Sequence, residues 1–145
     1  MKFTVLGVGD ALSMAQLHTE GFGRPWSESD FAILLANETS IAFGLKESSK
    51  LRAFILLRNI SPELEIFSLV VSRKFRRQGL ARCLVSKSLA SLAEAQTCFL
   101  EVSQSNKAAL SLYRSLGFKD IGIRHNYYQS KTGVFDHAIL MKFQL

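Results

Sequence analysis

The part of the sequence most able to bind a ligand is a short basic turn, Arg-Arg-Gln-Gly-Leu-Ala over residues 76–81, which follows an apolar run ending at Val70-Val71. A strand that leads through such a turn into a helix leaves backbone N–H groups unpaired where the helix dipole favours negative charge. Gly79 lets an anion approach closely because it has no side chain. The turn therefore predicts a phosphate site, and solvated charges on an ordinary turn are the alternative.

Two other side chains have the chemistry to move protons. Glu101 lies in the apolar segment 98–102, where an unpaired carboxylate is costly to bury, so it either faces solvent or serves a site. Tyr113 borders the apolar stripe of Ala109, Leu112 and Leu116 that is predicted for a helix over 106–116, and half-buried packing is its alternative role. Asn106 is predicted to be the N-cap of that helix.

Three segments in order resemble the GNAT family of acetyl-CoA-dependent N-acetyltransferases. They are Arg-x-x-Gly-x-Ala at 76–81, Leu-Glu-Val-Ser-Gln-Ser-Asn at 100–106, and Leu-Tyr-Arg-Ser-Leu-Gly-Phe at 112–118. Further matches narrow the resemblance to the ribosomal-protein-alanine N-acetyltransferases of that family. These matches are Pro25-Trp26-Ser27, Arg124, Tyr127-Tyr128, Ala138 and Met141. The resemblance is dense from about residue 67 to 141 and thin before Arg24.

The resemblance implies specific roles. It implies that Glu101 accepts the proton of the amine and that Tyr113 protonates the leaving thiolate. Coenzyme contacts are expected from the end of the preceding strand, the turn and the next helix: Leu69, Val70, Val71, Arg76, Arg77, Gln78, Gly79, Leu80, Ala81, Arg82 and Asn106. The residues expected near the acceptor peptide are Trp26, Tyr127 and Tyr128, with core packing as an equal alternative for Trp26. Ser72-Arg73 departs from the common Asp-Pro, and His137 replaces the usual Asp near the acceptor.

The implied acceptor is the N-terminal alanine of a small-subunit ribosomal protein. An α-amine titrates near ~8 and a lysine near ~10.4, so presenting a neutral lysine at pH 7 costs roughly 3.5 kcal/mol more. A single glutamate base thus favours an N-terminal amine, although desolvation can lower a lysine pKa. A GNAT enzyme acting on a protein lysine or a small-molecule amine stays open. A noncatalytic basic RNA-binding domain is a more distant alternative, because no RNA-binding motif occurs.

The composition of the chain limits which of these hypotheses are possible. The chain of 145 residues is 48% hydrophobic, which fits one domain over residues 1–145. Its net charge of +6 suggests anionic partners such as acetyl-CoA, and RNA would satisfy it equally. Cys83 and Cys98 and the three histidines lack ligand spacing, so no metal is expected. No signal peptide and no run of ~20 apolar residues is found, so a cytoplasmic protein without membrane contact is expected.

Hydrophobic periodicity predicts an α/β fold, and the resemblance implies a GNAT-like mixed, mostly antiparallel sheet with about four helices and a splayed central strand pair. Strands are expected over residues 3–6, 40–45, 52–59, 65–71, 98–102, 119–125 and 138–143. Helices are expected over residues 10–20, 27–36, 79–95 and 106–116. Ser27 with Asp30 forms a predicted capping box, and Gly117 is expected to end the last helix.

Overall fold

The computed structural model of the protein describes residues 1–129 and 133–145. Its helices and strands, in chain order, are β1 (Lys2–Leu6), α1 (Ala11–His18), α2 (Glu28–Ala36), β2 (Ser40–Glu47), β3 (Lys50–Ile60), β4 (Glu63–Val71), α3 (Leu80–Ser91), β5 (Thr97–Ser103), α4 (Lys107–Leu116), β6 (Lys119–Gln129) and β7 (Phe135–Gln144). Short 3-10 helices at Val8–Asp10 and Arg73–Phe75 precede α1 and α3. Within these described ranges, no helix is long and apolar enough to cross a membrane.

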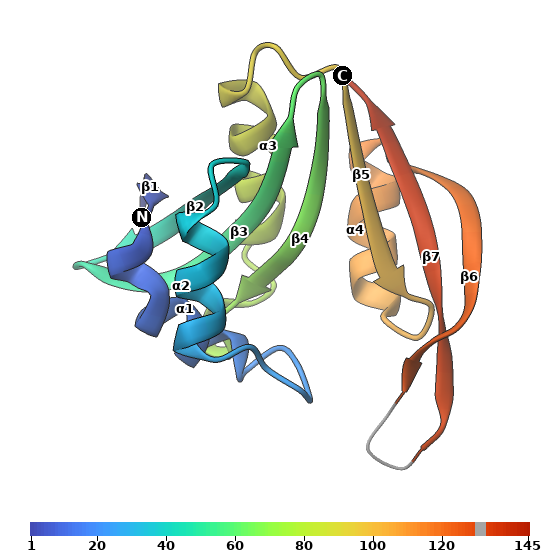
Figure 1. Ribbon diagram of the computed structural model, residues 1–145, viewed down its shortest axis with the longest axis horizontal. Coiled ribbons are helices and arrows are strands. Elements are labelled where there is room, and N and C mark those ends of the chain that lie inside the picture. The colour runs from blue at the N-terminus through green and yellow to red at the C-terminus, as the bar shows by residue number, and fades with distance from the viewer. Residues whose placement is uncertain (130–132) are drawn as a thin grey trace.

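All seven strands form one sheet in the order β1-β2-β3-β4-β5-β7-β6, and only β4 and β5 are parallel neighbours. Pairing between β4 and β5 runs from Glu63 opposite Thr97 to Ile66 opposite Leu100 and then stops. The two strands diverge beyond that point, as Figure 1 shows. The predicted mixed sheet with a splayed central pair is confirmed, and the region where β4 and β5 are no longer paired is called the opening below.

Helices cover the two faces of the sheet unequally (Figure 1). The pair α1 and α2 packs over β2, β3 and β4 around a buried cluster that includes Met14, Phe31 and Phe54. On the opposite face, α3 and α4 share a second buried cluster with strands on both sides of the opening. The α1/α2 cluster contains no residue of β5, β6 or β7. In the part of the chain that the structure describes, no helix covers this face of β5, β6 and β7 (Figure 1).

Local signals in the sequence set several helix ends. Ser27 Oγ accepts the backbone N–H of Asp30 at 3.1 Å, and the Asp30 carboxylate accepts the N–H of Ser27 at 2.9 Å, so the predicted capping box is confirmed. Gly117 ends α4 with a left-handed φ of 106°, as predicted. The expectation that α3 reaches residue 95 was wrong. It ends at Ser91, because the N–H groups of residues 96 and 97 bond to the Pro62 carbonyl and lead the chain into β5.

The predicted apolar stripe of α4 was correct only in part. Leu110 and Tyr113 are the buried residues of the helix, whereas Ala109, Leu112 and Leu116 are only partly buried. Ala109 and Leu116 pack against the same core cluster, so they lie at the edge of the buried face and Leu110 and Tyr113 lie at its centre. Tyr113 therefore points inward, whereas the prediction placed it at the border.

An aromatic cluster under the loop between α1 and α2 is centred on His18, which is 2% exposed. Its Nδ1 accepts the backbone N–H of Trp26 at 3.0 Å. The imidazole stacks on Phe22 at 4.2 Å and on the Trp26 ring at 4.9 Å. Burial lowers the pKa of His18 from 6.5 to about 4, so the ring is neutral at neutral pH.

Acidification should therefore destabilise the fold through His18. Between about pH 6.5 and pH 4 the unfolded chain binds a proton that the folded chain excludes, so the free energy of unfolding falls by about 2 to 3 kcal/mol as pH decreases. Urea unfolding at pH 7 and pH 4.5 measures this difference. His18→Asn keeps an acceptor at the δ1 position and does not titrate, so its pH dependence should be smaller. His125→Asn, at an exposed position, should retain the wild-type dependence of the free energy of unfolding on pH. The same pH dependence in both variants would contradict the role given to His18.

Candidate active site

The basic turn has the geometry of an anion site. Arg77 and Gly79 adopt left-handed φ values of 62° and 77° immediately before α3. No side chain caps α3, and the N–H of Cys83 bonds to the Gly79 carbonyl at 3.0 Å. The backbone N–H groups before Cys83, at the start of α3, have no acceptor within the helix and point out of its end. A Cβ on Gly79 would meet no heavy atom within 4 Å, so the space in front of the turn is open to a ligand.

Two of the predicted cationic side chains hold the turn in place. Arg76 donates from Nε to the Val71 carbonyl and from Nη2 to the Glu20 carbonyl, both at 3.0 Å. Arg82 donates from Nη2 to Ser115 Oγ on α4 at 2.5 Å, which links the helices on either side of the opening. These side chains thus have structural partners, while the backbone of the turn is left for the anion.

Glu20, which the sequence analysis missed, links the turn to the loop after α1. Its carboxylate accepts the N–H of Arg73 at 3.0 Å and the hydroxyl of Ser72 at 3.4 Å. Together with the Arg76 bond to the Glu20 carbonyl, these contacts join segments more than 50 positions apart in the sequence. A glutamate after a helix carries no sequence signal for such a contact. An open pocket of about 520 Å³ lies beside this contact, lined partly by Phe22 and Arg73, and not around Glu101.

The edge of β4 provides the second part of the site. A β-bulge at Phe67 interrupts pairing with β3, because Leu57 faces Ile66 and Leu56 faces Ser68. This bulge coincides with the last β4–β5 pair, and it was not predicted. Residues 67–71 are thus extended beside the opening with β3 on one side only. An extended chain that carries amide groups can pair with such an edge, as the predicted backbone role of Leu69, Val70 and Val71 requires.

Glu101 lies on the uncovered face of β5. Cys98, Leu100 and Val102 point into the core on the other face, so strand alternation directs Glu101 away from it. Its side chain is 24% exposed and accepts Arg124 Nη2 at Oε1 over 2.7 Å. A carboxylate with a cationic partner on an open face can be ionised without the cost of an isolated buried charge.

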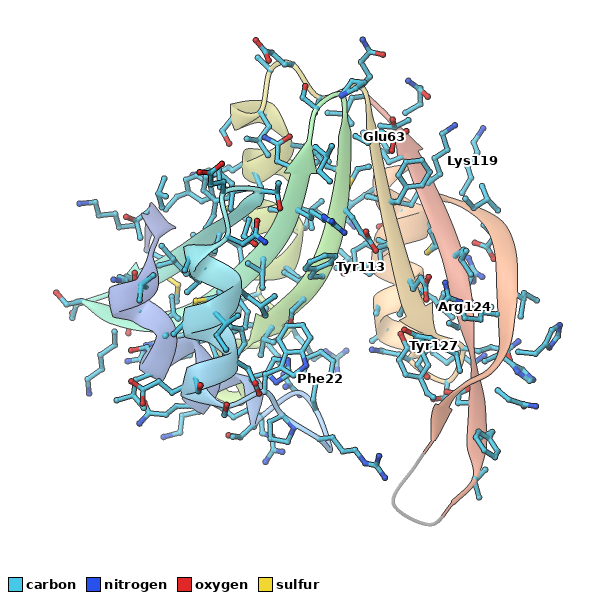
Figure 2. The ribbon with its side chains drawn as sticks, in the orientation of Figure 1. Phe22, Glu63, Tyr113, Lys119, Arg124 and Tyr127 are labelled. Atoms are coloured by element: carbon cyan, nitrogen blue, oxygen red, sulfur yellow. The ribbon has the colours of Figure 1, made fainter. Side chains whose placement is uncertain are left out.

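Aromatic side chains of β6 surround this ion pair. The Arg124 guanidinium lies 4.5 Å from the centroid of the Tyr127 ring, and both side chains lie on the same side of the opening in Figure 2. Burial raises the pKa of Tyr128, and the charge of Glu101 adds to that effect. The structure therefore brings predicted residues Glu101, Tyr127 and Tyr128 together. Trp26 packs instead on His18 beneath the opposite loop, and its packing alternative has structural support.

Tyr113 approaches the opening from the other face of the sheet. Its side chain is 6% exposed, its ring lies edge-on to Phe118 at 5.4 Å, and it projects from α4 between β4 and β5 in Figure 2. Burial raises the pKa of Tyr113, and the nearby Cys98 adds to the effect, so the phenol keeps its proton at neutral pH. Asn106 Oδ1 accepts the N–H of Ala109 at 3.2 Å, which confirms the predicted N-cap.

Asp136 is another contact that the sequence analysis missed. Its carboxylate accepts hydrogen bonds from the hydroxyls of Ser103 and Ser105, which lower its pKa to about 2. It also accepts the N–H of Ser105 at 3.2 Å. These bonds hold the end of β5 against β7, next to the predicted site.

Comparison with known proteins connects this geometry to a reaction. Residues 11–118 match the Acetyltransferase (GNAT) family. The chain belongs to this family. It is 39% identical over 119 residues to the [ribosomal protein bS18]-alanine N-acetyltransferase of Escherichia coli K12, which covers 81% of this chain and 79% of that protein. The Salmonella typhimurium protein of the same name is 33% identical over 142 residues, or 95% and 93% of the two chains.

Solved structures agree with the fold. The crystal structure of the ribosomal-protein-S18-alanine N-acetyltransferase from Escherichia coli matches with a TM-score of 0.92 at 32% identity, over 99% of this chain and 92% of that one. Arabidopsis thaliana NAA60 in complex with acetyl-CoA matches with a TM-score of 0.83 at 16% identity, over 99% and 98% of the chains, which supports the fold alone. The protein is thus an acetyl-CoA-dependent N-acetyltransferase. Its described residues contain no group of side chains suited to a metal ion.

A side chain at Gly79 should weaken acetyl-CoA binding. Because a Cβ there would meet no protein atom, Gly79→Val should act by straining the left-handed turn and by filling the space in front of it. Isothermal titration calorimetry should show a dissociation constant raised by about tenfold or more, equivalent to loss of a charge-assisted hydrogen bond. Gly7→Val controls for the added side chain alone, since that position also has open space, lies outside the site and has an extended φ of −139°. Wild-type affinity in a folded Gly79→Val would remove the turn from the coenzyme site.

Proposed function

We propose that this enzyme transfers the acetyl group of acetyl-CoA to the N-terminal amine of a protein, with the N-terminal alanine of a ribosomal protein as acceptor. The observation that carries the proposal is the position of Glu101 on an uncovered sheet face, with Arg124, Tyr127 and Tyr128 around it. The names of the relatives support this choice of acceptor. We further propose that residues 1–145 act as one domain and that the enzyme works in the cytoplasm, where ribosomes are found.

The coenzyme side of the site combines the end of β4, the turn before α3 and the start of α4. The backbone of the turn from Arg76 to Arg82 would hold the pyrophosphate at the start of α3, where unpaired N–H groups and the helix dipole favour anions. The edge formed by Leu69, Val70 and Val71 would bond the amides of the pantetheine arm. Asn106 would contact the coenzyme from the start of α4 while capping that helix. Bound in this way, acetyl-CoA supplies the thioester carbonyl that the amine attacks.

Glu101 is the proposed base. An amine attacks only in its neutral form, so a proton must leave it before or during attack. Among the described residues, only Arg124 bonds the carboxylate, at Oε1, so Oε2 would be left for the amine or for a bridging water. The second half of the chain thereby contributes the group that receives the proton.

Tyr113 is the proposed acid. Cleavage of the thioester leaves a thiolate, which a proton donor stabilises. The phenol keeps its proton because it is buried, and it reaches the opening from the face opposite Glu101. Base and acid would therefore act on the two sides of the reacting carbon without exchanging a proton directly.

The acceptor peptide would enter between the loop after α1 and the end of β6. Phe22 and Tyr127, each about half exposed, lie on opposite sides of the opening in Figure 2. Aromatic side chains on both sides can hold a short extended peptide through its apolar groups. The half-buried Trp26 would support this entrance from beneath, since its backbone N–H is fixed by His18.

A direct assay tests the proposed reaction. The enzyme is incubated with acetyl-CoA and peptides that begin with alanine, in matched versions with a free or a blocked N-terminus and with or without an internal lysine. Mass spectrometry then locates the acetylated nitrogen. Acetylation only of free N-termini supports the proposal. Modification of the lysine in blocked peptides would favour the lysine alternative, and no transfer to any peptide would favour a small-molecule amine.

Loss of the proposed base should slow turnover strongly. Glu101→Gln keeps the shape of the side chain and removes its basicity, so kcat should fall by about 10² to 10⁴ at pH 7. Raising pH should restore part of the rate, levelling near the α-amine pKa of roughly 8 for an N-terminal acceptor and rising toward about 10 for a lysine. Arg124→Gln is the matched control, because it removes the same ion pair but keeps the carboxylate, and it should lose less kcat. An undiminished rate in folded Glu101→Gln would refute the assignment.

Replacing the proposed acid should affect turnover but not coenzyme binding. Tyr113→Phe keeps the aromatic packing against Phe118 and removes only the hydroxyl, so kcat should fall by about 10-fold or more while acetyl-CoA affinity stays within about twofold. Steady-state kinetics and calorimetry measure the two effects. Since the ring is in the core, Tyr113→Leu should lower stability as well, unlike Tyr113→Phe. Wild-type kcat in Tyr113→Phe would leave Tyr113 with a packing role only.

A further inference from the structure

The strand β6 contains a wide bulge next to the proposed acceptor site. Arg124 faces Ala138 and Tyr128 faces Asp136, so three residues of β6 oppose the single residue His137 of β7. Asn126, in the middle of the bulge, has a left-handed φ of 55°. The bulge therefore adds two residues to β6 directly after Arg124, the partner of Glu101.

The bulge decides which side chains can meet. In a regular strand, residues 124 and 127 would point to opposite faces of the sheet, because side chains alternate with a period of two. The Arg124 guanidinium nevertheless lies over the Tyr127 ring at 4.5 Å, and the same guanidinium bonds Glu101 at 2.7 Å. Only an interruption of the alternation allows this arrangement. The stack beside the proposed base thus depends on the bulged conformation.

His137 supplies a side-chain bond that holds the bulge. Its Nδ1 accepts the backbone N–H of Asn126 at 3.0 Å, a group that the irregular ladder would leave without its usual carbonyl. The backbone of His137 is itself fixed, since its N–H bonds the Asp136 carboxylate at 2.9 Å and its carbonyl accepts the N–H of Gln104 at 2.9 Å. The imidazole is therefore a rigid acceptor placed under the left-handed residue. A left-handed non-glycine residue costs about 1 kcal/mol, which a hydrogen bond of this kind can offset.

We propose that His137 is a positioning residue for the acceptor: its hydrogen bond to Asn126 maintains the β6 bulge that places Tyr127 over the guanidinium of Arg124, the partner of Glu101. This inference rests on the proposed function, because the bulge matters to catalysis only if the acceptor amine reaches Glu101 on this face. His137 itself touches neither coenzyme nor reacting atoms in this account. Its influence should be confined to acceptor binding, with the coenzyme turn on the other half of the molecule unaffected.

Two variants of His137 distinguish the effect of its acceptor atom from the effect of its ring. His137→Phe keeps a ring but has no acceptor, whereas His137→Asn loses the ring and keeps an acceptor oxygen at the position of Nδ1. His137→Phe should raise the KM for the alanine peptide by about 3- to 10-fold, the range expected when one neutral hydrogen bond is lost. Its acetyl-CoA affinity should stay at the wild-type value. His137→Asn should restore most of the peptide KM, and His125→Phe, which changes only the neighbouring ring 4.8 Å away, should behave like wild type.

Hydrogen exchange of the Asn126 amide, measured by NMR, reports on the bond itself. Exchange should be faster by at least threefold in His137→Phe and return to near the wild-type rate in His137→Asn. Wild-type exchange and KM in His137→Phe would overturn the inference, as would an Asn variant as impaired as the Phe variant. If wild-type enzyme acetylated no N-terminal peptide, the proposed function would fail, and the exchange rates would still decide whether His137 holds the bulge.

Discussion

The structure depends on one interruption in its sheet, the end of β4–β5 pairing at Ile66 and Leu100. Backbone N–H and C=O groups at a strand edge need partners, and leaving a buried one unpaired costs about 1 to 3 kcal/mol. Two parallel strands that part in mid-sheet are therefore favourable only where water or a ligand can reach their edges. The bulge at Phe67 interrupts the pairing of β4 with β3 at the same point along β4. The parting from β5 therefore coincides with an irregularity on the other edge of β4. In the proposed complex, the pantetheine arm of acetyl-CoA would take the place of the missing strand.

One face of this opening is closed and the other is accessible. Leu84 and Val85 of α3 and Leu110 and Tyr113 of α4 belong to a single buried cluster that spans the parting. Across the same parting, the cluster beneath α1 and α2 stops at β4. Because of this asymmetry, Tyr113, the proposed proton donor, and Glu101, the proposed base, lie on opposite faces of the sheet. The donor is part of the core, where its environment is dry and fixed, whereas Glu101 lies where a peptide amine can arrive from solvent.

Features determined by neighbouring residues could be predicted from the sequence, and those that depend on distant segments could not. Alternation and capping residues located all seven strands and the starts of α2 and α4, as Ser27 and Asn106 illustrate. The buried face of α4 was predicted only in part, because several apolar residues fit a helical stripe and the sheet beneath selects which of them lie at its centre. The bonds of Glu20 to Arg73 and of His137 to Asn126 cross between segments whose sequences carry no shared signal. Helix caps and strands were thus predictable from local sequence, but contacts between distant segments were not.

The ion pair between Arg124 and Glu101 raises the question of how a paired carboxylate can act as a base. The Arg124 side chain is 51% exposed, and ion pairs with that exposure contribute only about 0 to 1 kcal/mol. Such a pair orients the carboxylate, because the guanidinium also stacks on Tyr127, but it binds too weakly to exclude another cation. An incoming ammonium group can therefore share the carboxylate through Oε2 and lose its proton there. A fully buried pair would be held by several kcal/mol and would block this exchange, so the open face of β5 is as necessary to the proposed base as the carboxylate itself.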